Sequence, residues 1–315
     1  MALSFVKMHG LGNDFVVLDA RAKPVHLSMS AIQAICDRRF GIGCDQLIII
    51  EPSQSQQAEE PSARAAETID CFMRIYNPDG SQAQNCGNAT RCIAWRLMEE
   101  TGRSRIAIKT LGGLLSCTRT VDGRVAVDMG APIFDWQQIP LSKEVDVMAL
   151  PIAIPSPYWG EGMGEGGRHA QILPPHPNLL PDGGKELPVA LSMGNPHAVF
   201  VVKDAEAIHW QQIGAALEHH PLFPQRANIS FVELLSPQHI ALRVWERGAG
   251  ATLACGTAAC AALVACAKKG LTGRFAKVSL PGGDLDIRWD EATGHVMMTG
   301  GVAFVFEGVW HGSGV

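Results

Sequence analysis

The chain has 315 residues, of which 47% are hydrophobic and 18% charged, and its formal net charge is −5. A chain of this length can bury a large core and is better interpreted as two domains than as one. No stretch approaches the ~18 apolar residues of a membrane span, and no basic stripe offers the surface that nucleic acids or anionic membranes need. We therefore expect a small-molecule partner, with no nucleic acid and no membrane.

The first ten residues lack the basic and apolar regions of a signal peptide, which favours the cytoplasm. The chain has nine cysteines. An odd number in a chain this large fits a reduced compartment better than a disulfide framework, which is typical of small secreted domains. Some of these thiols are therefore expected to be free for chemistry.

Two buried strands are predicted in the first half, each beside a polar amide residue, and both recur in the same order in the second half. The first pair is residues 15–20 after Gly12-Asn13 and residues 199–205 after Gly194-Asn195. The second pair is residues 47–51 after Gln46 and residues 229–233 after Asn228. The amide residues of each pair lie 182 positions apart, which indicates an internal repeat.

A third repeated passage ends in a cysteine followed by a glycine. A predicted strand over residues 73–77 leads to Cys86-Gly87, and one over residues 242–246 leads to Cys255-Gly256, with the same spacing from the strand arginine to the cysteine. Apolar residues follow each Cys-Gly pair at helical spacing. Each cysteine is therefore predicted to lie at the start of a helix.

A fourth passage, residues 112–130, recurs as residues 282–300 and predicts a strand, a turn and a strand at the end of each half. The offset between the halves falls from 182 to 169 residues at the two cysteines, which places an insertion near residues 54–68. A second irregular segment, about residues 151–188, is rich in Pro and Gly and separates the halves. Little regular structure is expected in either segment.

The repeat predicts an α+β fold with two pseudo-symmetric domains of like topology, each a strand-rich, barrel-like sheet around a central helix. The predicted N-terminal domain is residues 1–131, to which residues 300–315 return, and the predicted C-terminal domain is residues 132–299. The active site is expected in the cleft between them, because pockets often form at such boundaries.

Two cysteines at helix starts suggest acid–base chemistry. The helix dipole and the unpaired N–H groups there can lower the pKa of a thiol from ~8.5 to about 3.5–7.5. Inversion of a stereocentre needs a base on one face of the carbon and an acid on the other, and two pseudo-symmetric domains can supply both.

N–H groups of Gly87-Asn88 and Gly256-Thr257 can hold a carboxylate as the α-proton leaves. No pyridoxal phosphate context and no metal-ligand spacing is present, so no cofactor and no metal is expected.

These residues carry a resemblance to the diaminopimelate epimerase family that covers nearly the whole chain. The segments that match are Lys7-Met8-His9-Gly10-Leu11-Gly12-Asn13-Asp14-Phe15, Gly43-Cys44-Asp45-Gln46, Asn77-Pro78-Asp79-Gly80, Cys86-Gly87-Asn88 through Arg91-Cys92, Gly194-Asn195-Pro196-His197, and Glu246-Arg247-Gly248-Ala249-Gly250 through Cys255-Gly256-Thr257.

The resemblance implies that Cys86 and Cys255 are the catalytic acid–base pair and that His197 and Glu246 support catalysis. It also implies a set of substrate-binding residues: Asn13, Gln46, Asn77, Gly87, Asn88, Asn195, Asn228, Glu246, Arg247, Gly256 and Thr257. The implied reaction is the cofactor-independent conversion of LL-2,6-diaminopimelate to the meso isomer, a step in lysine and peptidoglycan precursor biosynthesis.

The chain departs from the family pattern at a few positions. Gln84-Asn85 precede the first catalytic cysteine where Glu-Met is expected, and Ala89 takes the place of a glycine. Phe306 stands where the family often has a tyrosine used in dimer contacts, so a homodimer is a weaker expectation. The insertions near residues 54–68 and 160–184 are also longer than the family pattern implies.

Two other functions fit the same residues. A racemase of another amino acid, such as proline, glutamate or histidine, would use the same scaffold, but Arg247 with Asn77, Asn195 and Asn228 favours a substrate with a second polar head. Alternatively, Cys86 and Cys255 could serve as a thiol redox sensor. The remaining cysteines are expected to be small buried apolar residues: Cys36, Cys44, Cys71, Cys92, Cys117, Cys260 and Cys266.

Overall fold

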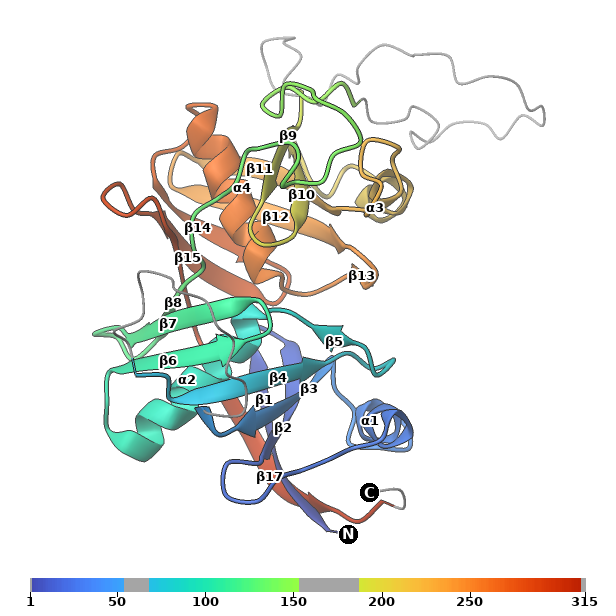
Figure 1. The fold of residues 1–315 in the computed structure, drawn as a ribbon. Helices are drawn as coiled ribbons and strands as arrows, with labels where there is room; N and C mark the ends of the chain where they lie inside the picture. The colour runs from blue at the N-terminus through green and yellow to red at the C-terminus, as the bar shows by residue number, and fades with distance from the viewer. Residues whose placement is uncertain (1, 54–67, 153–186, 313–315) are drawn as a thin grey trace, which may run out of the picture. The chain divides into compact units, whose positions relative to one another are not determined.

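The structure is a computed structural model that describes residues 2–53, 68–152 and 187–312. The chain divides into two compact units (Figure 1). Unit 1 is Met1–Met129 with Met297–Val315, and unit 2 is Gly130–Val296. The predicted irregular segments 54–68 and 151–188 lie outside the described residues, except for residues 68, 151–152 and 187–188. All of residues 160–184 lie outside them as well.

Unit 1 is built mainly of strands. Its elements in chain order are β1 (Leu3–Gly10), β2 (Asn13–Asp19), α1 (Met29–Cys36), β3 (Gln46–Glu51), β4 (Cys71–Tyr76), β5 (Gln82–Ala83), α2 (Gly87–Thr101), β6 (Arg105–Thr110), β7 (Gly113–Arg119), β8 (Val125–Asp128), most of β16 (Val296–Gly300) and β17 (Ala303–Trp310). β1 pairs antiparallel with both β17 and β2, and β2 pairs parallel with β3. The remaining pairings are β3–β4 and β4–β5 antiparallel, β4–β6 parallel, and β6–β7, β7–β8 and β8–β16 antiparallel.

Unit 2 repeats this order. Its elements are β9 (Val189–Ser192), β10 (Pro196–Val202), α3 (Trp210–Glu218), β11 (Asn228–Ser236), β12 (His239–Glu246), β13 (Gly250–Ala251), α4 (Gly256–Lys268), β14 (Phe275–Leu280) and β15 (Gly283–Trp289). The pairings are β9–β10 antiparallel, β10–β11 parallel, β11–β12 and β12–β13 antiparallel, β12–β14 parallel and β14–β15 antiparallel.

The two units share strand register as well as strand order. In unit 1 Phe15 faces Gln46 across the β2–β3 pair, and in unit 2 His197 faces Asn228 across the β10–β11 pair. Both residues are shifted by the same 182 positions that the sequence repeat gives. The predicted α+β fold of two strand-rich domains with like topology is therefore confirmed.

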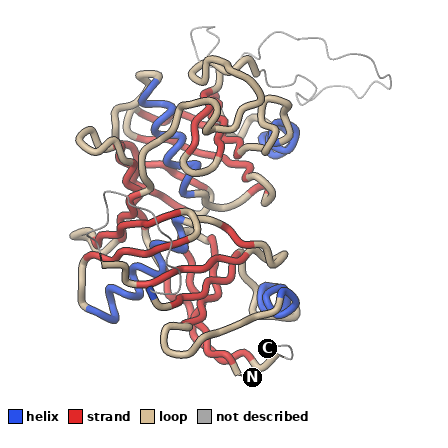
Figure 2. The backbone as a smooth tube through the Cα atoms, viewed as in Figure 1, coloured by secondary structure: helices blue, strands red, loops and turns tan. Residues whose placement is uncertain are grey.

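A long helix runs among the strands of each unit (Figure 2). In α4, residues Ala258 to Cys266 are all buried, and they are mostly alanine and cysteine. A helix that is apolar on every side is stable only when strands cover it on all sides, and small side chains let those strands approach closely. In α2, Cys92 and Ile93 are likewise fully buried. These are the predicted central helices.

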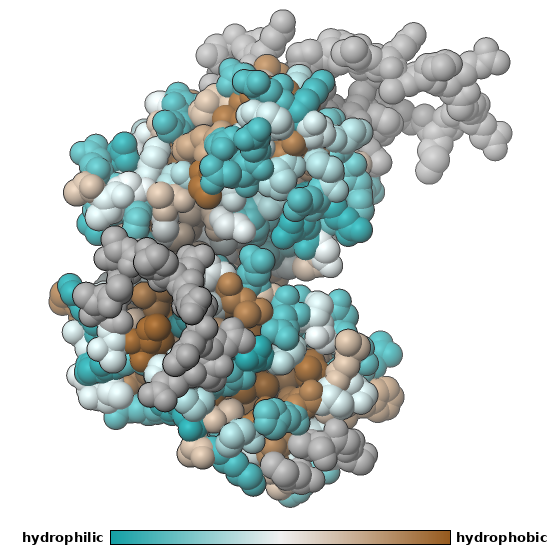
Figure 3. All heavy atoms as spheres, viewed as in Figure 1, coloured by the Kyte–Doolittle hydropathy of each residue, from teal (hydrophilic) through white to brown (hydrophobic). Residues whose placement is uncertain are grey.

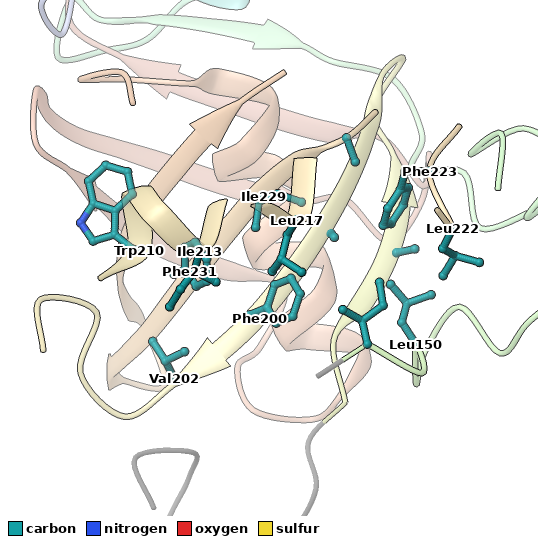
Figure 4. Packing of buried hydrophobic residues seen from close by; sticks show 14 of the residues in the cluster. Leu150, Phe200, Val202, Trp210, Ile213, Leu217, Leu222, Phe223, Ile229 and Phe231 are labelled. Atoms are coloured by element: carbon teal, nitrogen blue, oxygen red, sulfur yellow. The ribbon is translucent and has the colours of Figure 1, made fainter. Parts of the chain in front are cut away.

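Each unit has its own hydrophobic core. In unit 2 the rings of Phe200 and Phe231 stack with centroids 5.7 Å apart, and α3 packs Ile213 and Leu217 into the same cluster (Figure 4). In unit 1, α1 packs Ile32 and Ile35 against the strands. The two short helices thus hold one face of each sheet in place.

The seven cysteines expected to be apolar packing residues are all buried, and none of the nine cysteines forms a disulfide. Within the described part of the chain, no helix is long and apolar enough to cross a membrane.

Candidate active site

The structure places both catalytic candidates at the predicted position. Cys86 is the N-cap of α2 and Cys255 is the N-cap of α4, and both have extended backbone angles. Their carbonyls accept the first helical hydrogen bonds, from Thr90 N and from Ala259 N. The N–H groups of the first turn, which have no carbonyl partner within a helix, therefore begin directly after each thiol.

In unit 1 the amide of Asn13 lies beside Cys86. Its Oδ1 accepts a hydrogen bond from Asn88 Nδ2 at 3.1 Å and lies 3.8 Å from Cys86 Sγ, which donates to it. Its Nδ2 donates to Asp45 Oδ2 at 3.0 Å. Because a carboxylate only accepts, Asp45 fixes which end of the Asn13 amide faces the thiol.

A second polar pair in unit 1 joins Gln46 and Asn77. Gln46 Nε2 donates to Asn77 Oδ1 at 3.0 Å, and Asn77 Nδ2 donates to Ser81 Oγ at 3.1 Å. The β3–β4 pairing brings these residues together, because Leu47 faces Tyr76 in that register.

Gly87 lies where the start of α2 meets two methionines. A Cβ at this position would lie 2.6 Å from Met298 Cε and 3.2 Å from Met129 Cε. A residue with a side chain would have to push these methionines aside, so glycine allows the helix start to pack closely beneath Cys86.

In unit 2 the amide of Asn195 is oriented the other way round. Its Oδ1 lies 2.9 Å from His197 Nε2, and its Nδ2 donates to Thr257 Oγ1 at 3.4 Å. Thr257 Oγ1 in turn lies 3.5 Å from Cys255 Sγ. Since Asn195 Oδ1 can only accept, His197 donates from Nε2.

His197 is completely buried in β10. Burial, helped by the nearby charge of Arg247, lowers the pKa of His197 to about 3. The imidazole is therefore neutral near pH 7 and acts as a fixed donor, and its Nδ1 has no hydrogen-bond partner among the described residues.

Cys255 departs from the expectation that both thiols have a lowered pKa. The side chain is 5% exposed. Burial, the negative charge of Glu246 and a hydrogen bond to that carboxylate raise the pKa of Cys255 well above its ordinary value. The bonds from Thr257 and from the backbone of Ala258 act in the opposite direction but are outweighed. Glu246 also accepts a hydrogen bond from Thr252 Oγ1.

Asn228 and Arg247 form the second polar pair of unit 2. Asn228 is 2% exposed; its Nδ2 donates to Pro196 O at 2.9 Å, and its Oδ1 accepts from Arg247 N at 3.0 Å. Arg247 itself is exposed, and its Nη1 donates to Gln225 O at 3.3 Å. Asn228 thus holds the backbone of Arg247, while the guanidinium remains open to a ligand.

The predicted site residues thus gather in two groups, one in each unit. Unit 1 holds Asn13, Gln46, Asn77, Cys86, Gly87 and Asn88; unit 2 holds Asn195, His197, Asn228, Glu246, Arg247, Cys255, Gly256 and Thr257. No group of three or more His, Cys, Asp or Glu residues in the described ranges is arranged to hold a metal ion.

Sequence reasoning missed two residues beside these groups: Asp45, which accepts from Asn13, and Glu218, which accepts from Trp245 Nε1 and Gly248 N on either side of Glu246 and Arg247. Asp45 lies next to Gln46 in a segment that the resemblance had already singled out, so its position gave a signal. Glu218 lies at the end of a helix that no repeat motif marked, and only its burial reveals it.

Comparison with known proteins identifies the family of the chain. The family model described as diaminopimelate epimerase matches residues 5–134 and 189–305. The chain is 46% identical to diaminopimelate epimerase of Rhodospirillum centenum over 308 residues, covering 98% of this chain and 92% of that protein. It is 45% identical to diaminopimelate epimerase of Acidiphilium cryptum over 307 residues, covering 98% and 96%.

Solved structures share the fold at low identity. The chain is similar to a hydroxyproline epimerase from Agrobacterium vitis with a TM-score of 0.63 and 12% identity, covering 98% of this chain and 92% of that one. It is also similar to a predicted epimerase from Pseudomonas aeruginosa with a TM-score of 0.60 and 17% identity, covering 99% and 100%. Together, the family model and relatives matched over almost their full length show that the chain belongs to the diaminopimelate epimerase family.

Proposed function

We propose that this enzyme converts LL-2,6-diaminopimelate to meso-diaminopimelate with Cys86 and Cys255 as its acid–base pair. The observation that carries the proposal is the matched position of the two cysteines. Each is the N-cap of the central helix of its own unit, and the two units have the same topology. Two equivalent thiols are what inversion of one carbon requires.

The reaction moves one proton off the α-carbon and another onto it. One cysteine, as a thiolate, removes the α-proton from one face and becomes a thiol. The electron pair of the broken C–H bond stays on the α-carbon and the carboxylate. The other cysteine, as a thiol, donates its proton to the opposite face and becomes a thiolate. A single group that returned the proton to the same face would only restore the starting configuration.

The pKa of Cys255 supports a starting state for this cycle. Burial and the charge of Glu246 raise that pKa, so Cys255 rests as a thiol. In the half-reaction that starts from this state Cys255 is the acid. Cys86, whose thiol donates to Asn13 Oδ1 in the structure, must first lose that proton before it takes the α-proton. Glu246 then accepts the hydrogen bond of the thiol until the substrate carbanion takes its proton.

Recognition of the substrate follows from the polar groups of both units. The exposed guanidinium of Arg247 suits a bidentate contact with a carboxylate. The first-turn N–H groups of α2 and α4, from Gly87-Asn88 and Gly256-Thr257, suit the carboxylate on which charge builds up. The amides of Asn13, Gln46, Asn77 and Asn195 serve the remaining polar groups. Asn228 acts by holding the backbone of Arg247, and His197 acts through Asn195.

This set favours a substrate with two amino-acid heads over a racemase for a small amino acid. Buried polar groups left unpaired by a smaller substrate cost binding free energy. Meso-diaminopimelate serves lysine and peptidoglycan synthesis, and we propose that the reaction takes place in the cytoplasm.

We also propose that the enzyme is a homodimer that associates through β17. This strand has large apolar side chains that are about half exposed: Phe304, Val305, Phe306 and Val309. Hydrophobic residues also interrupt the hydrophilic surface of unit 1 (Figure 3). An exposed apolar strand of this kind is stabilised when a second copy covers it.

The test of the reaction is proton NMR of the purified enzyme with LL-diaminopimelate in deuterated water, with a reductant and no added cofactor. The expected result is formation of the meso isomer with deuterium at the inverted carbon, and no exchange with proline, glutamate or histidine. Exchange with one of those amino acids instead would assign a different racemase. No exchange with any substrate would favour the redox role of the thiols.

A further inference from the structure

Glu218, the last residue of α3, is a buried carboxylate that the proposed reaction does not use. Its side chain is 6% exposed. A negative charge at a helix C-terminus opposes the helix dipole, and burying a charge is costly unless it is well paired. Glu218 goes against both rules, so its contacts with other residues have to offset the free energy that its charge and burial cost.

Three donors hold the Glu218 carboxylate, and His219 Nε2 lies 3.9 Å from its Oε2. Trp245 Nε1 donates to Oε2 at 2.7 Å, and Gly248 N donates to Oε1 at 2.9 Å. Arg226 Nη1 forms an ion pair with Oε1 at 3.6 Å. Burial alone would raise the pKa of Glu218, but these bonds outweigh it and the pKa lies below its ordinary value.

Two of these donors lie on either side of Glu246 and Arg247. Trp245 immediately precedes the pair and Gly248 immediately follows it, so Glu218 holds both ends of the turn that carries them. α3 also packs tightly here, because a Cβ on Gly214 would lie 2.5 Å from Trp245 Cβ. The turn that carries Glu246 and Arg247 is therefore held firmly against α3.

The third donor lies on the segment that leads into Asn228. Arg226 has a positive φ of 61°, a conformation that costs a non-glycine residue free energy. The carbonyl of the preceding residue, Gln225, accepts the hydrogen bond from Arg247 Nη1. Glu218 thus joins the two segments that support Arg247, one carrying its backbone and one contacting its guanidinium.

The internal repeat shows that the fold itself does not require these charges. At the offset of 182 residues that relates Gln46 to Asn228, Glu218 corresponds to Cys36 and Arg226 corresponds to Cys44. In unit 1 those two residues are buried thiols whose sulfurs lie 3.5 Å apart. A neutral contact is enough there, and the charged pair occurs only in the unit that carries Arg247.

We infer that Glu218 is a positioning residue that holds Arg247 and Glu246 in the geometry for binding the substrate and for contacting Cys255. The inference rests on the proposed function, because it acts through the carboxylate contact assigned to Arg247. Its effect should therefore appear in KM for diaminopimelate and depend on the presence of the Arg247 side chain.

The test is a double-mutant cycle with Glu218→Gln, Arg247→Ala and the double variant, with kcat and KM measured for LL-diaminopimelate. In Glu218→Gln the amide NH₂ faces one of the N–H donors and the ion pair with Arg226 is lost. We expect KM to rise about tenfold with kcat within about twofold, and we expect little further rise when the change is made in Arg247→Ala. Glu206→Gln is the matched control, since Glu206 pairs with Arg243 on the surface of the same unit. The activity of this variant should not change.

If circular dichroism shows that Glu218→Gln does not fold, Trp245→Phe tests the same inference. It removes one donor and leaves the carboxylate paired with Gly248 and Arg226, so a smaller rise in KM is expected, again absent in Arg247→Ala. Unchanged KM in Glu218→Gln and Trp245→Phe, or a full additional rise in the Arg247→Ala background, overturns the inference. If Arg247→Ala itself leaves KM unchanged, the substrate contact assigned to Arg247 fails, and the inference fails with it.

Discussion

The two asparagines beside Cys86 and Cys255 present opposite ends of their amides. Asn13 turns its oxygen toward Cys86 because Asp45 accepts from its Nδ2. Asn195 turns its Nδ2 toward Thr257, beside Cys255, because His197 occupies its oxygen. Equivalent residues in the repeat thus present different groups to the two thiols, an acceptor oxygen to Cys86 and donor groups to the side of Cys255.

Burial of His197 makes a prediction about stability and pH. Its pKa is lowered to about 3 in the folded protein, against an ordinary value of about 6.5 in the unfolded chain. Between these values the unfolded chain binds the extra proton, so this contribution to the free energy of unfolding is complete above about pH 6.5 and is lost as pH falls toward the folded pKa.

The matched variant is His197→Phe, because phenylalanine occupies the equivalent position 15 in unit 1. Between pH 7.5 and 5, urea titrations should show wild-type stability falling about 2 kcal/mol more than that of His197→Phe. Parallel loss of stability in both proteins would mean that His197 titrates normally. Activity should also fall in the variant, since Asn195 loses its donor.

The positions of the two thiols could be predicted from the sequence, but the raised pKa of Cys255 could not. The equal spacing from Arg74 to Cys86 and from Arg243 to Cys255 revealed equivalent helix starts. The helix dipole then suggested a lowered pKa for both. The raised pKa of Cys255 depends on burial and on Glu246, which lies nine positions earlier in the chain and contacts the thiol only after the turn at β13 has formed.

At the scale of elements, the sequence predicted the repeated strands and the two central helices but not α1 and α3. These helices have only eight and nine residues. Ser28 caps α1 by accepting from Ala31 N at 3.2 Å, a signal that was available. α3 begins without a side-chain cap and has a glycine at its centre, so local propensity gives little indication of it.

The close packing of α3 against β12 predicts that Gly214→Ala destabilises the protein. Alanine favours a helix over glycine by up to about 1 kcal/mol, but its Cβ would lie 2.5 Å from Trp245 Cβ and 2.9 Å from Cγ. Those atoms belong to the fixed part of the side chain, so overpacking, typically about 1–3 kcal/mol, should win.

Thermal or urea unfolding measures the effect. Gly273→Ala is the control, because nothing lies within 4 Å of a Cβ there, and it should be neutral or slightly stabilising. Equal stability of Gly214→Ala and wild type would show that α3 can shift away from Trp245.

At the scale of the whole molecule, the apolar surface of β17 predicts self-association. Light scattering should give about twice the 33.8 kDa mass of one chain. Val305→Lys places a charge in the proposed interface and should shift the mass toward one chain, while Phe40→Lys, on an exposed residue outside β17, should not. A wild-type monomer at working concentrations would contradict the proposal.

The central claim is that two thiols act together on one carbon, and the most direct measurement compares Cys86→Ala and Cys255→Ala with the wild type. Each variant is given LL- and meso-diaminopimelate in turn, under reducing conditions, and interconversion is followed by NMR. The account predicts that each substitution alone abolishes interconversion in both directions, with circular dichroism spectra like that of the wild type. Near-normal interconversion in either variant would show that one of the two cysteines is not part of the acid–base pair, and the two-thiol account would fail.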